Sequence, residues 1–586
     1  MALDLSQDQK TTGAANFAQA AGDLAHQANP NDPTRRTFLK TAAATGAVLP
    51  VSAAVYFGYD QWKGLSYNPV RTAIIGTGDE GGVLIGEHNP EFTQIVATCD
   101  IRPYNQERIF TGDTGPDGKW NGKSPRKGLN HIYGEDKARG IRQFATVADL
   151  LKAKDELKLE AVIIATPLVT HHDVAIQCMD AGLHVLCEKL MARRIEYCKR
   201  MITAAKKNGV ILSIGHQRHY SMLYAHALEV VNAGVLGEVT HIRALWHRNN
   251  SWPFTPKTSG PATVPGTDPY YRDGWCPPIY QMDAEKVTPD LLKGITFNGP
   301  DGEPQQCFDD LEHLVRWRLY DKPGGGLMAE LGSHQLDAAS IFLGKVKPLS
   351  VQGVGGKFFY RKNRNDRESD DSVFVTYEFP GAKHPKAGNG GTDDKDIVVV
   401  TYSSINTNSF ESYGECLMGS RGTLIVEMEG DAYLFKESQP GKANSGGKGT
   451  NVTVTGKPGG APVLEAASTW GGPASSAVVK TGNTTGWGSL SRGYREEMEH
   501  FAFCVRAQQK AKLPGKDLYQ KKDGKFVHSG VLPRCHGEIA MADAVLALTA
   551  NLAMDAKTRI EFQPEWFDGD AIGQGSNPED QYGKKA

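Results

Sequence analysis

Residues 70–81 read VRTAIIGTGDEG, an apolar run that leads directly into a glycine-rich turn. The run predicts a buried strand, and the G-x-G-x-x-G pattern after it is typical of a strand–turn–helix unit that binds a dinucleotide. Gly76 would make the tight turn, Gly78 would let the backbone approach a pyrophosphate, and Gly81 would let helix and strand pack closely. Glu80 lies within the same motif, and we expect it to contact the cofactor as well. The helix that follows would offer its first N–H groups to the phosphates.

A second apolar run over residues 94–99 ends in Asp100, 24 residues after Gly76. An acid roughly 20 residues beyond the glycine turn commonly binds the ribose hydroxyls of NAD. Such a carboxylate repels the 2′-phosphate of NADP, so Asp100 favours NAD. Arg102 lies two residues further on and could weaken that preference, which leaves NADP open.

Strand-like and helix-like segments alternate after the glycine turn. Strands are expected at 160–165, 183–187 and 210–214, and helices at 171–181 and 193–207. Strands that alternate with helices predict a parallel, doubly wound α/β sheet, which we place over residues 70–215.

The composition narrows the possible classes of protein. The chain has 586 residues, of which 40% are hydrophobic, and a net charge of −2, which fits a globular protein and disfavours a nucleic-acid binder. The nine cysteines are scattered without a C-x-x-C pair, and the sequence contains no H-E-x-x-H motif. We therefore predict neither a disulfide scaffold nor a metal site.

Residues 1–53 are expected to be a disordered segment followed by an export signal. Residues 1–33 are polar and lack periodicity. Residues 34–40 read TRRTFLK and precede an Ala-rich, mildly apolar stretch, which resembles a twin-arginine signal with a cleavage site near residue 53. The twin-arginine machinery exports folded proteins, so the sequence predicts a periplasmic protein. A retained membrane anchor and an ordinary short helix are the alternatives.

Two motifs further along resemble the Gfo/Idh/MocA oxidoreductases, a family that includes glucose–fructose oxidoreductase and inositol dehydrogenases. Residues 166–171 read TPLVTH and residues 181–190 read AGLHVLCEKL, against the family patterns T-P-N-x-x-H and A-G-K-H-V-x-x-E-K-P. Leu168 replaces the family's Asn, and Leu190 replaces a Pro that is usually cis. The resemblance extends over about residues 70–562.

The resemblance implies a Rossmann domain followed by an α+β domain with a large, mainly antiparallel sheet over residues 216–570. Strand-like runs between residues 238 and 428 agree with this. Two stretches rich in Gly, Pro or polar residues, at 249–308 and 438–490, are expected to be insertions. Because the large sheet often forms the subunit interface in the family, the resemblance also implies a homodimer or homotetramer.

Lys189 is the strongest catalytic candidate. It follows a predicted strand, at the edge of the sheet where ligands bind, and in the family this lysine contacts both the substrate and the nicotinamide ribose. The resemblance also places the cofactor against Thr166, Pro167, His171 and Glu188. On residue type alone, a surface lysine paired with Glu188 is the alternative.

Glu330 and His334 form a second candidate pair within the stretch GGGLMAELGSHQLD, residues 324–337. Their i, i+4 spacing would put both side chains on one face of a helix. The family carries an Asp at its active site where this chain has Glu330, and His334 is suited to proton transfer near neutral pH. Glu330 would orient His334 or a neighbouring hydroxyl, and Asp337 would support His334 or the helix. A capping acid beside a packed histidine is the alternative.

His216, Arg218 and Tyr220 alternate just after the last predicted strand of the first domain. In an extended segment the three side chains would face one way. The resemblance makes them candidates for contacts with the substrate, whereas a polar linker between domains explains them equally well.

Together these features predict an NAD(P)-dependent oxidoreductase that transfers a hydride between a nicotinamide and a secondary alcohol of a sugar, glycoside or cyclitol. Export from the cytoplasm would favour a tightly bound cofactor that is recycled in each turnover. Two alternatives stay open. One is an NAD-dependent glycosidase that acts by transient oxidation and elimination, and the other is a non-catalytic nucleotide-binding protein.

Overall fold

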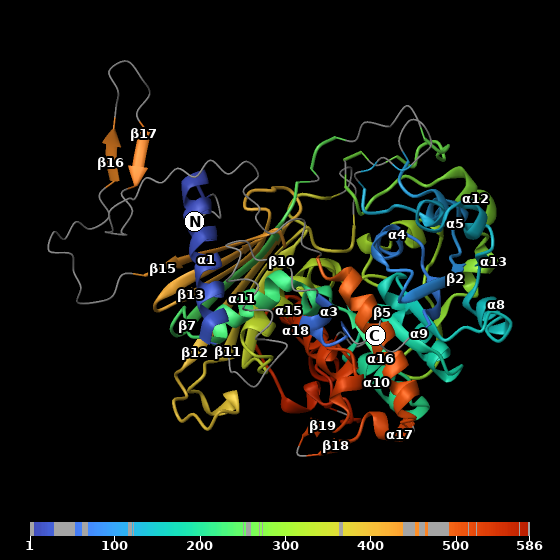
Figure 1. Ribbon diagram of the computed structural model, residues 1–586. Helices are drawn as coiled ribbons and strands as arrows, with labels where there is room; N and C mark the ends of the chain where they lie inside the picture. The colour runs from blue at the N-terminus through green and yellow to red at the C-terminus, as the bar shows by residue number, and fades with distance from the viewer. Residues whose placement is uncertain are drawn as a thin grey trace.

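Figure 1 shows the protein as a computed structural model in which two large sheets lie side by side. The structure describes residues 5–27, 53–60, 62, 68–114, 120, 122, 124–249, 251–253, 260–268, 270–271, 273–361, 367–437, 452–455, 463–466, 492–513, 515–522, 524–573 and 575–583. The twin-arginine segment at 34–40 and most of the predicted insertion at 438–490 lie outside these residues.

The first sheet has six parallel strands in the order β3-β2-β1-β4-β5-β6. The strands are β1 (Val70–Ile75), β2 (Thr93–Cys99), β3 (Arg142–Phe144), β4 (Ala161–Ile164), β5 (His184–Glu188) and β6 (Leu212–Gly215). The connecting helices are α4 (Asp79–Glu87), α5 (Pro103–Thr111), α6 (Leu129–Tyr133), α7 (Glu135–Ala138), α8 (Val147–Lys152), α9 (His171–Asp180) and α10 (Ile195–Asn208). The strand order reverses between β1 and β4, so a ligand crevice is expected at their carboxyl ends.

The second sheet has eight strands in the order β15-β14-β13-β7-β12-β11-β10-β20, with β7 and β12 parallel and the other neighbours antiparallel. These are β7 (Val239–His247), β10 (Ser350–Gly356), β11 (Ser372–Pro380), β12 (Ile397–Ile405), β13 (Tyr413–Gly419), β14 (Gly422–Glu427), β15 (Asp431–Lys436) and β20 (Ile560–Glu561). Every second residue of β12 is buried, as a sheet with one covered face requires. The predicted fold class, a Rossmann sheet followed by a mainly antiparallel sheet, is confirmed.

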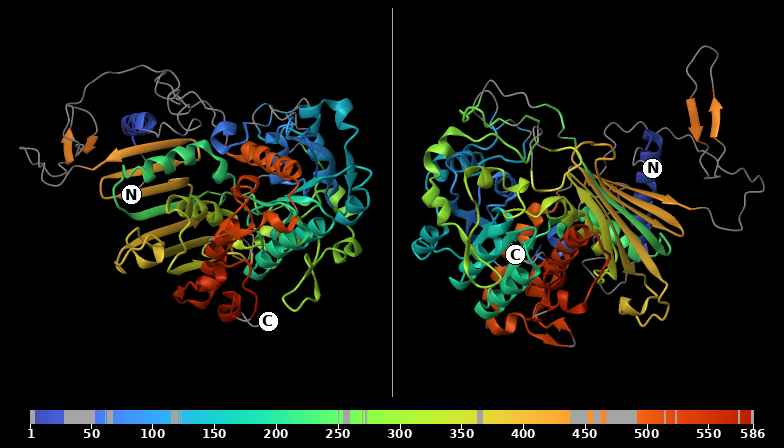
Figure 2. Two further views of the ribbon diagram at one scale, coloured as in Figure 1. Left: turned by 60° about the horizontal axis from the view of Figure 1, so that its bottom comes forward. Right: turned by 180° about the vertical axis from the view of Figure 1, so that it is seen from behind.

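Helices from distant parts of the chain cover the two sheets (Figure 2). The large sheet packs against α11 (Met222–Asn232), α15 (Ser333–Phe342) and α18 (Gly537–Ala556). The helix α16 (Tyr494–Ala511) lies between β15 and β20 of the large sheet in sequence but packs on the Rossmann domain against α4, β1 and β6. The helix α18 is long and apolar enough to cross a membrane, yet it packs inside the protein against α10 and β10.

The N-terminal region differs from expectation. Disorder was expected over residues 1–33, but Gln7–Gln27 form the helix α1, which lies along the edge strand β15 (Figures 1 and 2). Phe17 is 1% exposed, and Asn16 donates through Nδ2 to the Leu434 carbonyl oxygen at 3.0 Å. The helix was missed because most of its apolar face consists of alanine and glycine, which carry little periodic signal.

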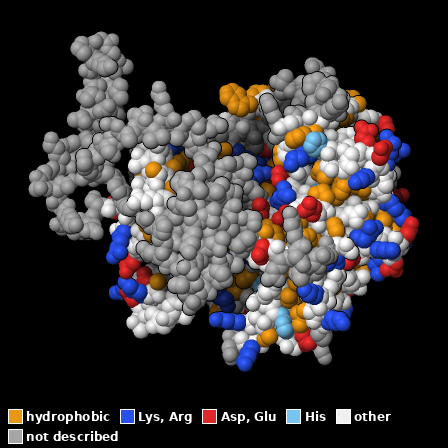
Figure 3. Space-filling view, viewed as in Figure 1, with side chains coloured by type: hydrophobic (Ala, Val, Ile, Leu, Met, Phe, Trp, Pro, Cys, Tyr) orange, Lys and Arg blue, Asp and Glu red, His pale blue; other side chains and the backbone are white. Residues whose placement is uncertain are grey.

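The predicted insertion at 249–308 packs on the Rossmann domain. It contains α12 (Gln281–Lys286), α13 (Pro289–Lys293), β8 (Thr296–Asn298) and β9 (Pro304–Gln306). Of these, α12 packs on α5, and β8 packs on α9. On the face seen in Figure 3, acidic and basic side chains are interspersed over the Rossmann domain, as the net charge of −2 leads one to expect.

Candidate active site

The glycine turn after β1 fits the pyrophosphate of a dinucleotide. A Cβ on Gly76, whose φ is +87°, would lie 2.3 Å from the Ala165 carbonyl oxygen, and one on Gly81 would lie 2.1 Å from the Gly76 carbonyl oxygen. Packing inside the protein therefore requires both glycines. Of the described atoms, a Cβ on Gly78 would meet Asn105 Nδ2 alone, at 3.7 Å, so Gly78 leaves room for a ligand to approach the backbone. Among the residues that the structure describes, no side chain caps α4 at this end, which leaves its first N–H groups available to an anion.

Asp100, at the end of β2, turns its carboxylate toward the glycine turn. Its Oδ2 accepts hydrogen bonds from the Thr77 N–H at 2.7 Å and the Thr77 hydroxyl at 3.1 Å. An acid beside the turn is placed as the ribose-binding acid of a Rossmann site, so the residues present fit NAD. The guanidinium of Arg102, the other candidate here, pairs with Asp283 of the insertion.

Two buried carboxyl groups, Glu80 on α4 and Glu188 at the end of β5, face the same region as Lys189. Burial, and after it the neighbouring Glu80, raise the pKa of Glu188 well above its usual value. Burial also raises the pKa of Glu80, against the opposing charge of Lys189. Among the described residues, the Oε1 atoms of both groups lack a hydrogen-bond partner. Buried polar atoms without partners are what a bound polar ligand would satisfy.

Lys189 lies at the carboxyl end of β5, where its Nζ donates to the carbonyl oxygen of Glu330 at 2.8 Å. Its backbone N–H donates to the Glu188 Oε2 atom at 3.1 Å. The peptide bond between Lys189 and Leu190 is cis, so the backbone keeps at Leu190 the geometry that the family pattern associates with Pro. The lysine thus bridges the Rossmann domain and the second domain.

The TPLVTH segment builds the wall beside Lys189. The ring nitrogens of His171 lie 2.8 Å from the Leu190 carbonyl oxygen and 2.9 Å from the Thr166 carbonyl oxygen. Burial lowers the pKa of His171. The Thr170 hydroxyl donates to the Pro167 carbonyl oxygen at 2.8 Å. The structure therefore uses His171 to join the loops after β4 and β5, although the sequence made it a candidate for the cofactor.

Glu330 lies in a π-helical turn, η5 (Met328–Gly332), that leads into α15. Its carboxylate pairs with Arg318 at 2.6 Å. Although burial raises the pKa of Glu330, the positive charges of Arg318 and Lys189 lower it below the usual value, so the group is ionised. The expected orientation of His334 by this carboxylate does not occur, because the wider π turn breaks the simple i, i+4 alignment.

His334, at the start of α15, is 8% exposed and packs against Trp246, with 5.5 Å between ring centroids. Its Nδ1 has no hydrogen-bond partner among the described residues. Burial, and then the charges of Lys189 and Arg218, hold the pKa of His334 well below its usual value. The imidazole is therefore neutral at physiological pH and able to accept a proton or a hydrogen bond.

The three predicted substrate contacts lie beneath the site. His216, Arg218 and Tyr220 are each 2% exposed or less, which leaves little surface for a substrate. The expected alternation fails because residues Gln217–Tyr220 form a 3₁₀ helix, η3, rather than an extended segment. Arg218 pairs with Glu415 at 2.8 Å and with Glu429 at 2.9 Å, and it donates to the His334 carbonyl oxygen at 2.7 Å.

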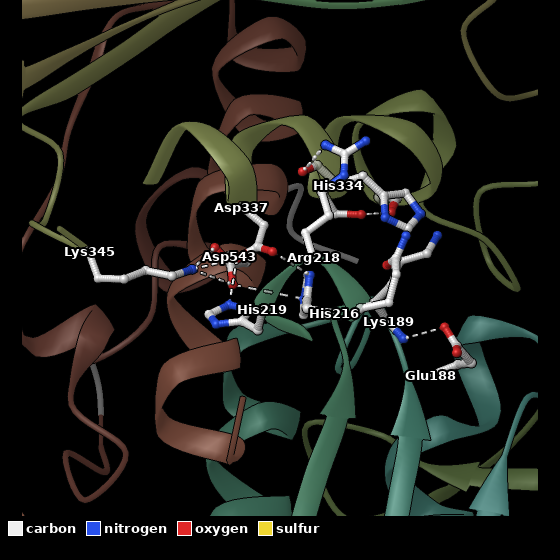
Figure 4. A network of polar contacts seen from close by, with 12 residues as sticks. Glu188, Lys189, His216, Arg218, His219, His334, Asp337, Lys345 and Asp543 are labelled. Atoms are coloured by element: carbon white, nitrogen blue, oxygen red, sulfur yellow. Dashed lines mark hydrogen bonds and ion pairs between the residues drawn. The ribbon is translucent and has the colours of Figure 1, made fainter. Parts of the chain in front are cut away.

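A cluster of charged side chains extends this buried layer (Figure 4). Lys345 Nζ lies 2.6 Å from Asp337 Oδ1 and 2.9 Å from Asp543 Oδ1. His219 contacts Asp337 at 2.9 Å, and His216 lies 3.8 Å from Asp337. The spacing of His216, Asp337 and Asp543 is compatible with a metal ion, but the Lys345 ammonium already supplies the positive charge between the two carboxylates. Asp337 thus supports this layer rather than the imidazole of His334.

Sequence reasoning missed Arg318, Lys345, Asp543 and Asp283. None of them lies in a motif, and Asp283 and Asp543 meet their partners only when segments far apart in the chain pack together. A basic residue near a candidate acid, as Arg318 is to Glu330, was the one local hint.

Comparisons with known proteins agree with the two domains. A profile described as "Oxidoreductase family, NAD-binding Rossmann fold" matches residues 70–216, and one described as "GFO/IDH/MocA C-terminal domain" matches residues 302–386.

Three curated relatives share part of the chain. Inositol 2-dehydrogenase 2 from Saccharopolyspora erythraea is 31% identical over 114 residues, which cover 19% of this chain and 33% of the relative. The 2,7-anhydro-N-acetylneuraminate hydratase from Mediterraneibacter gnavus is 31% identical over 297 residues, 50% of this chain and 60% of that protein. A glycosyl hydrolase family 109 protein from Solibacter usitatus is 28% identical over 230 residues, 37% of this chain and 46% of that protein.

The chain spans about half the length of the curated relatives it matches. The glycine turn and the Lys189 loop both lie within the first matched segment, and the second matched segment follows it in the chain. Residues 70–216 and 302–386 are thus similar to the two domains of Gfo/Idh/MocA oxidoreductases.

Proposed function

We propose that the protein is an NAD(P)-dependent oxidoreductase that oxidises a secondary alcohol of a sugar or cyclitol, or catalyses the reverse reaction. The observation that carries the proposal is the position of Lys189. It lies at the carboxyl end of β5 in the same crevice as the glycine turn, and its Nζ is 2.8 Å from the backbone of Glu330. The lysine therefore stands between the nucleotide-binding turn and His334, on the adjoining domain.

Each residue of the site has a distinct role in the proposed reaction. The glycine turn and Asp100 would hold the dinucleotide, and the bound nicotinamide would supply the hydride acceptor. The neutral His334 accepts the proton of the carbinol hydroxyl, while the Lys189 ammonium donates a hydrogen bond to its oxygen. The Glu330 carboxylate, paired with Arg318, keeps the backbone that binds Lys189 in place.

Replacement of Lys189 tests the proposal. The wild type, Lys189→Ala and His334→Ala would be assayed for NADH formation with a panel of neutral and acidic sugars and inositols. Each variant is expected to lose roughly 100- to 10 000-fold in kcat/KM. Lys207→Ala, an exposed lysine on α10, is the matched control and should keep full activity. Full turnover in both site variants would refute the assignment.

An NAD-dependent glycosidase is the second candidate, because a relative of this chain is named a glycosyl hydrolase family 109 protein. In that reaction the same hydride transfer would be transient and followed by elimination. Release of free sugar from a glycoside with no net formation of NADH would favour it. Tight nucleotide binding with no turnover on either class of substrate would favour a non-catalytic protein.

We propose in addition that residues 34–40 direct export by the twin-arginine machinery to the periplasm, with the cofactor held tightly through the cycle. The pattern TRRTFLK supports this. Replacement of both arginines by lysine should retain the protein in the cytoplasm, as cell fractionation would show. Stoichiometric NAD released on denaturing the purified protein would support tight binding. We further propose a homo-oligomer, which sedimentation would test.

A further inference from the structure

The end of β2 presents two contradictory signals for the choice between NAD and NADP. An acid at this position selects the free 2′-hydroxyl of NAD, whereas a nearby arginine accommodates the 2′-phosphate of NADP. This chain carries both, Asp100 and, two residues later, Arg102. The outcome therefore depends on whether the Arg102 guanidinium is available.

Asp283, from α12 of the insertion, forms an ion pair with that guanidinium. The Nε and Nη2 atoms of Arg102 each lie 2.9 Å from Asp283 Oδ2. The Asp283 side chain is 0% exposed and that of Arg102 is 14% exposed. This largely buried pair, in which two guanidinium nitrogens share one carboxylate oxygen, is strongly held, because either charge alone would be poorly solvated.

The surrounding contacts keep Asp283 in place. Its Oδ1 atom accepts the backbone N–H of Tyr104 at 3.0 Å, in the first turn of α5. The ring of Tyr104 stacks on Tyr280, with 3.7 Å between centroids. The insertion is thus attached to the segment that carries Arg102 by both a hydrogen bond and an aromatic contact.

The next arginine along α5 is also engaged. Arg108 pairs with Asp79 at 2.9 Å, and its guanidinium lies over the Tyr104 ring. Together Asp100, Arg102 and Asp283 carry two negative charges and one positive charge. A 2′-phosphate placed here would meet a net negative charge, whereas a 2′-hydroxyl would not.

We propose that Asp283 is a specificity-determining residue, which selects NAD over NADP by holding Arg102 away from the ribose. The proposal rests on the nucleotide site of the proposed function. It makes the insertion at 249–308 part of cofactor recognition, rather than only an addition to the second domain.

Asp283→Asn provides the test, because the amide keeps a hydrogen-bond acceptor for the Tyr104 N–H and removes the charge. Fluorescence titration of nucleotide-stripped protein with NADH and NADPH measures both dissociation constants without any turnover. We expect NADPH to bind the variant roughly 10- to 100-fold more tightly than it binds the wild type, the range of a charged hydrogen bond. The affinity for NADH should change less than about threefold.

Two further variants separate the proposal from a structural effect. Arg102→Ala alone should not tighten NADPH binding, because it leaves two negative charges at the site, whereas Asp283→Asn combined with Arg102→Ala should lose the gain. Asp290→Asn, an exposed aspartate of the same insertion, is the matched control and should bind like the wild type.

The outcomes are distinguishable. If Asp283→Asn binds NADH normally but its NADPH affinity stays within twofold of the wild type, the role of Asp283 is overturned and the proposed function stands. A gain that survives removal of Arg102 also overturns it. If neither nucleotide binds the wild type, the nucleotide site itself is refuted, and the role of Asp283 with it.

Discussion

Lys189 and Arg218 are both cations that contact the backbone of residues 330–334, yet their surroundings differ. Lys189 is partly exposed, and its Nζ donates to the Glu330 carbonyl oxygen. The Arg218 side chain is 1% exposed and is held by two carboxylates and the His334 carbonyl oxygen. A partly exposed cation with spare donors is available to a ligand, whereas a buried cation paired with two carboxylates stabilises the packing around it. The proposed function assigns Lys189 to chemistry, whereas the burial and the ion pairs of Arg218 indicate a role in stability.

Arg218→Met is expected to have the largest effect on stability. It leaves Glu415 and Glu429 buried without their partner, so the free energy of unfolding should fall by about 3–5 kcal/mol. Urea unfolding measures the change. Lys189→Met is the matched variant in the wall and should alter stability by less than about 1 kcal/mol. If Arg218→Met unfolds like the wild type but weakens substrate binding, Arg218 belongs to the wall after all.

His216, in the same buried layer as Arg218, should make the stability of the protein depend on pH. Burial, opposed by Asp337, lowers the pKa of His216 from 6.5 to about 3 in the folded protein. Between these values the unfolded chain binds a proton that the folded protein does not, so stability is lost as the pH falls from about 6.5 toward 3. One such histidine contributes up to about 1.4 kcal/mol per pH unit.

His216→Gln should therefore reduce the slope of unfolding free energy against pH by up to that amount between about pH 6 and 4. Urea unfolding at several pH values would show this. His131→Gln is the control, because the His131 side chain is exposed and its loss should leave the slope unchanged. An unchanged slope in His216→Gln would mean that this histidine is protonated in the folded protein.

Glu330→Asp carries the smallest expected effect. The side chain becomes one methylene shorter, so the 2.6 Å contact with Arg318 cannot persist without moving the backbone that binds Lys189. We expect kcat/KM to fall roughly tenfold, since misplacement by about 1 Å can cost up to 100-fold. Glu330→Gln keeps the length of the side chain and removes its charge, so it distinguishes an effect of length from an effect of charge. Undiminished turnover in Glu330→Asp would show that the Arg318 pair does not position Lys189.

The sequence predicted the Rossmann domain closely, from β1 to the end of β6, because each signal there is local. A strand, a glycine turn and a helix adjoin one another over 70–87, and Asp100 follows the next strand at the usual interval. Lys189 was located by a short motif at a strand end, which is also a local feature. The helix α1 was missed because the alanine and glycine of its apolar face carry little periodic signal, and its contacts with β15, more than 400 residues away, leave no local pattern.

The candidate site was predicted less completely than the fold. Glu330 and His334 were identified, but their expected partnership was not, because a π-helical turn and Arg318 redirect the carboxylate. His216, Arg218 and Tyr220 were assigned to the substrate on the assumption of an extended segment. Their burial follows from packing against residues such as Glu415, Asp543 and Arg534, which no spacing along the chain connects to them.

The sequence by itself determined the parallel sheet, the glycine turn, the acid at the end of β2 and the lysine at the end of β5. These depend on backbone sterics and hydrophobic periodicity within a few residues. Only the tertiary structure decided which charges are available to a ligand. It paired Arg102 with Asp283, Arg318 with Glu330 and Lys345 with two aspartates. The physical reason is that burial makes an unpaired charge costly, so the fold pairs buried charges that no sequence motif connects.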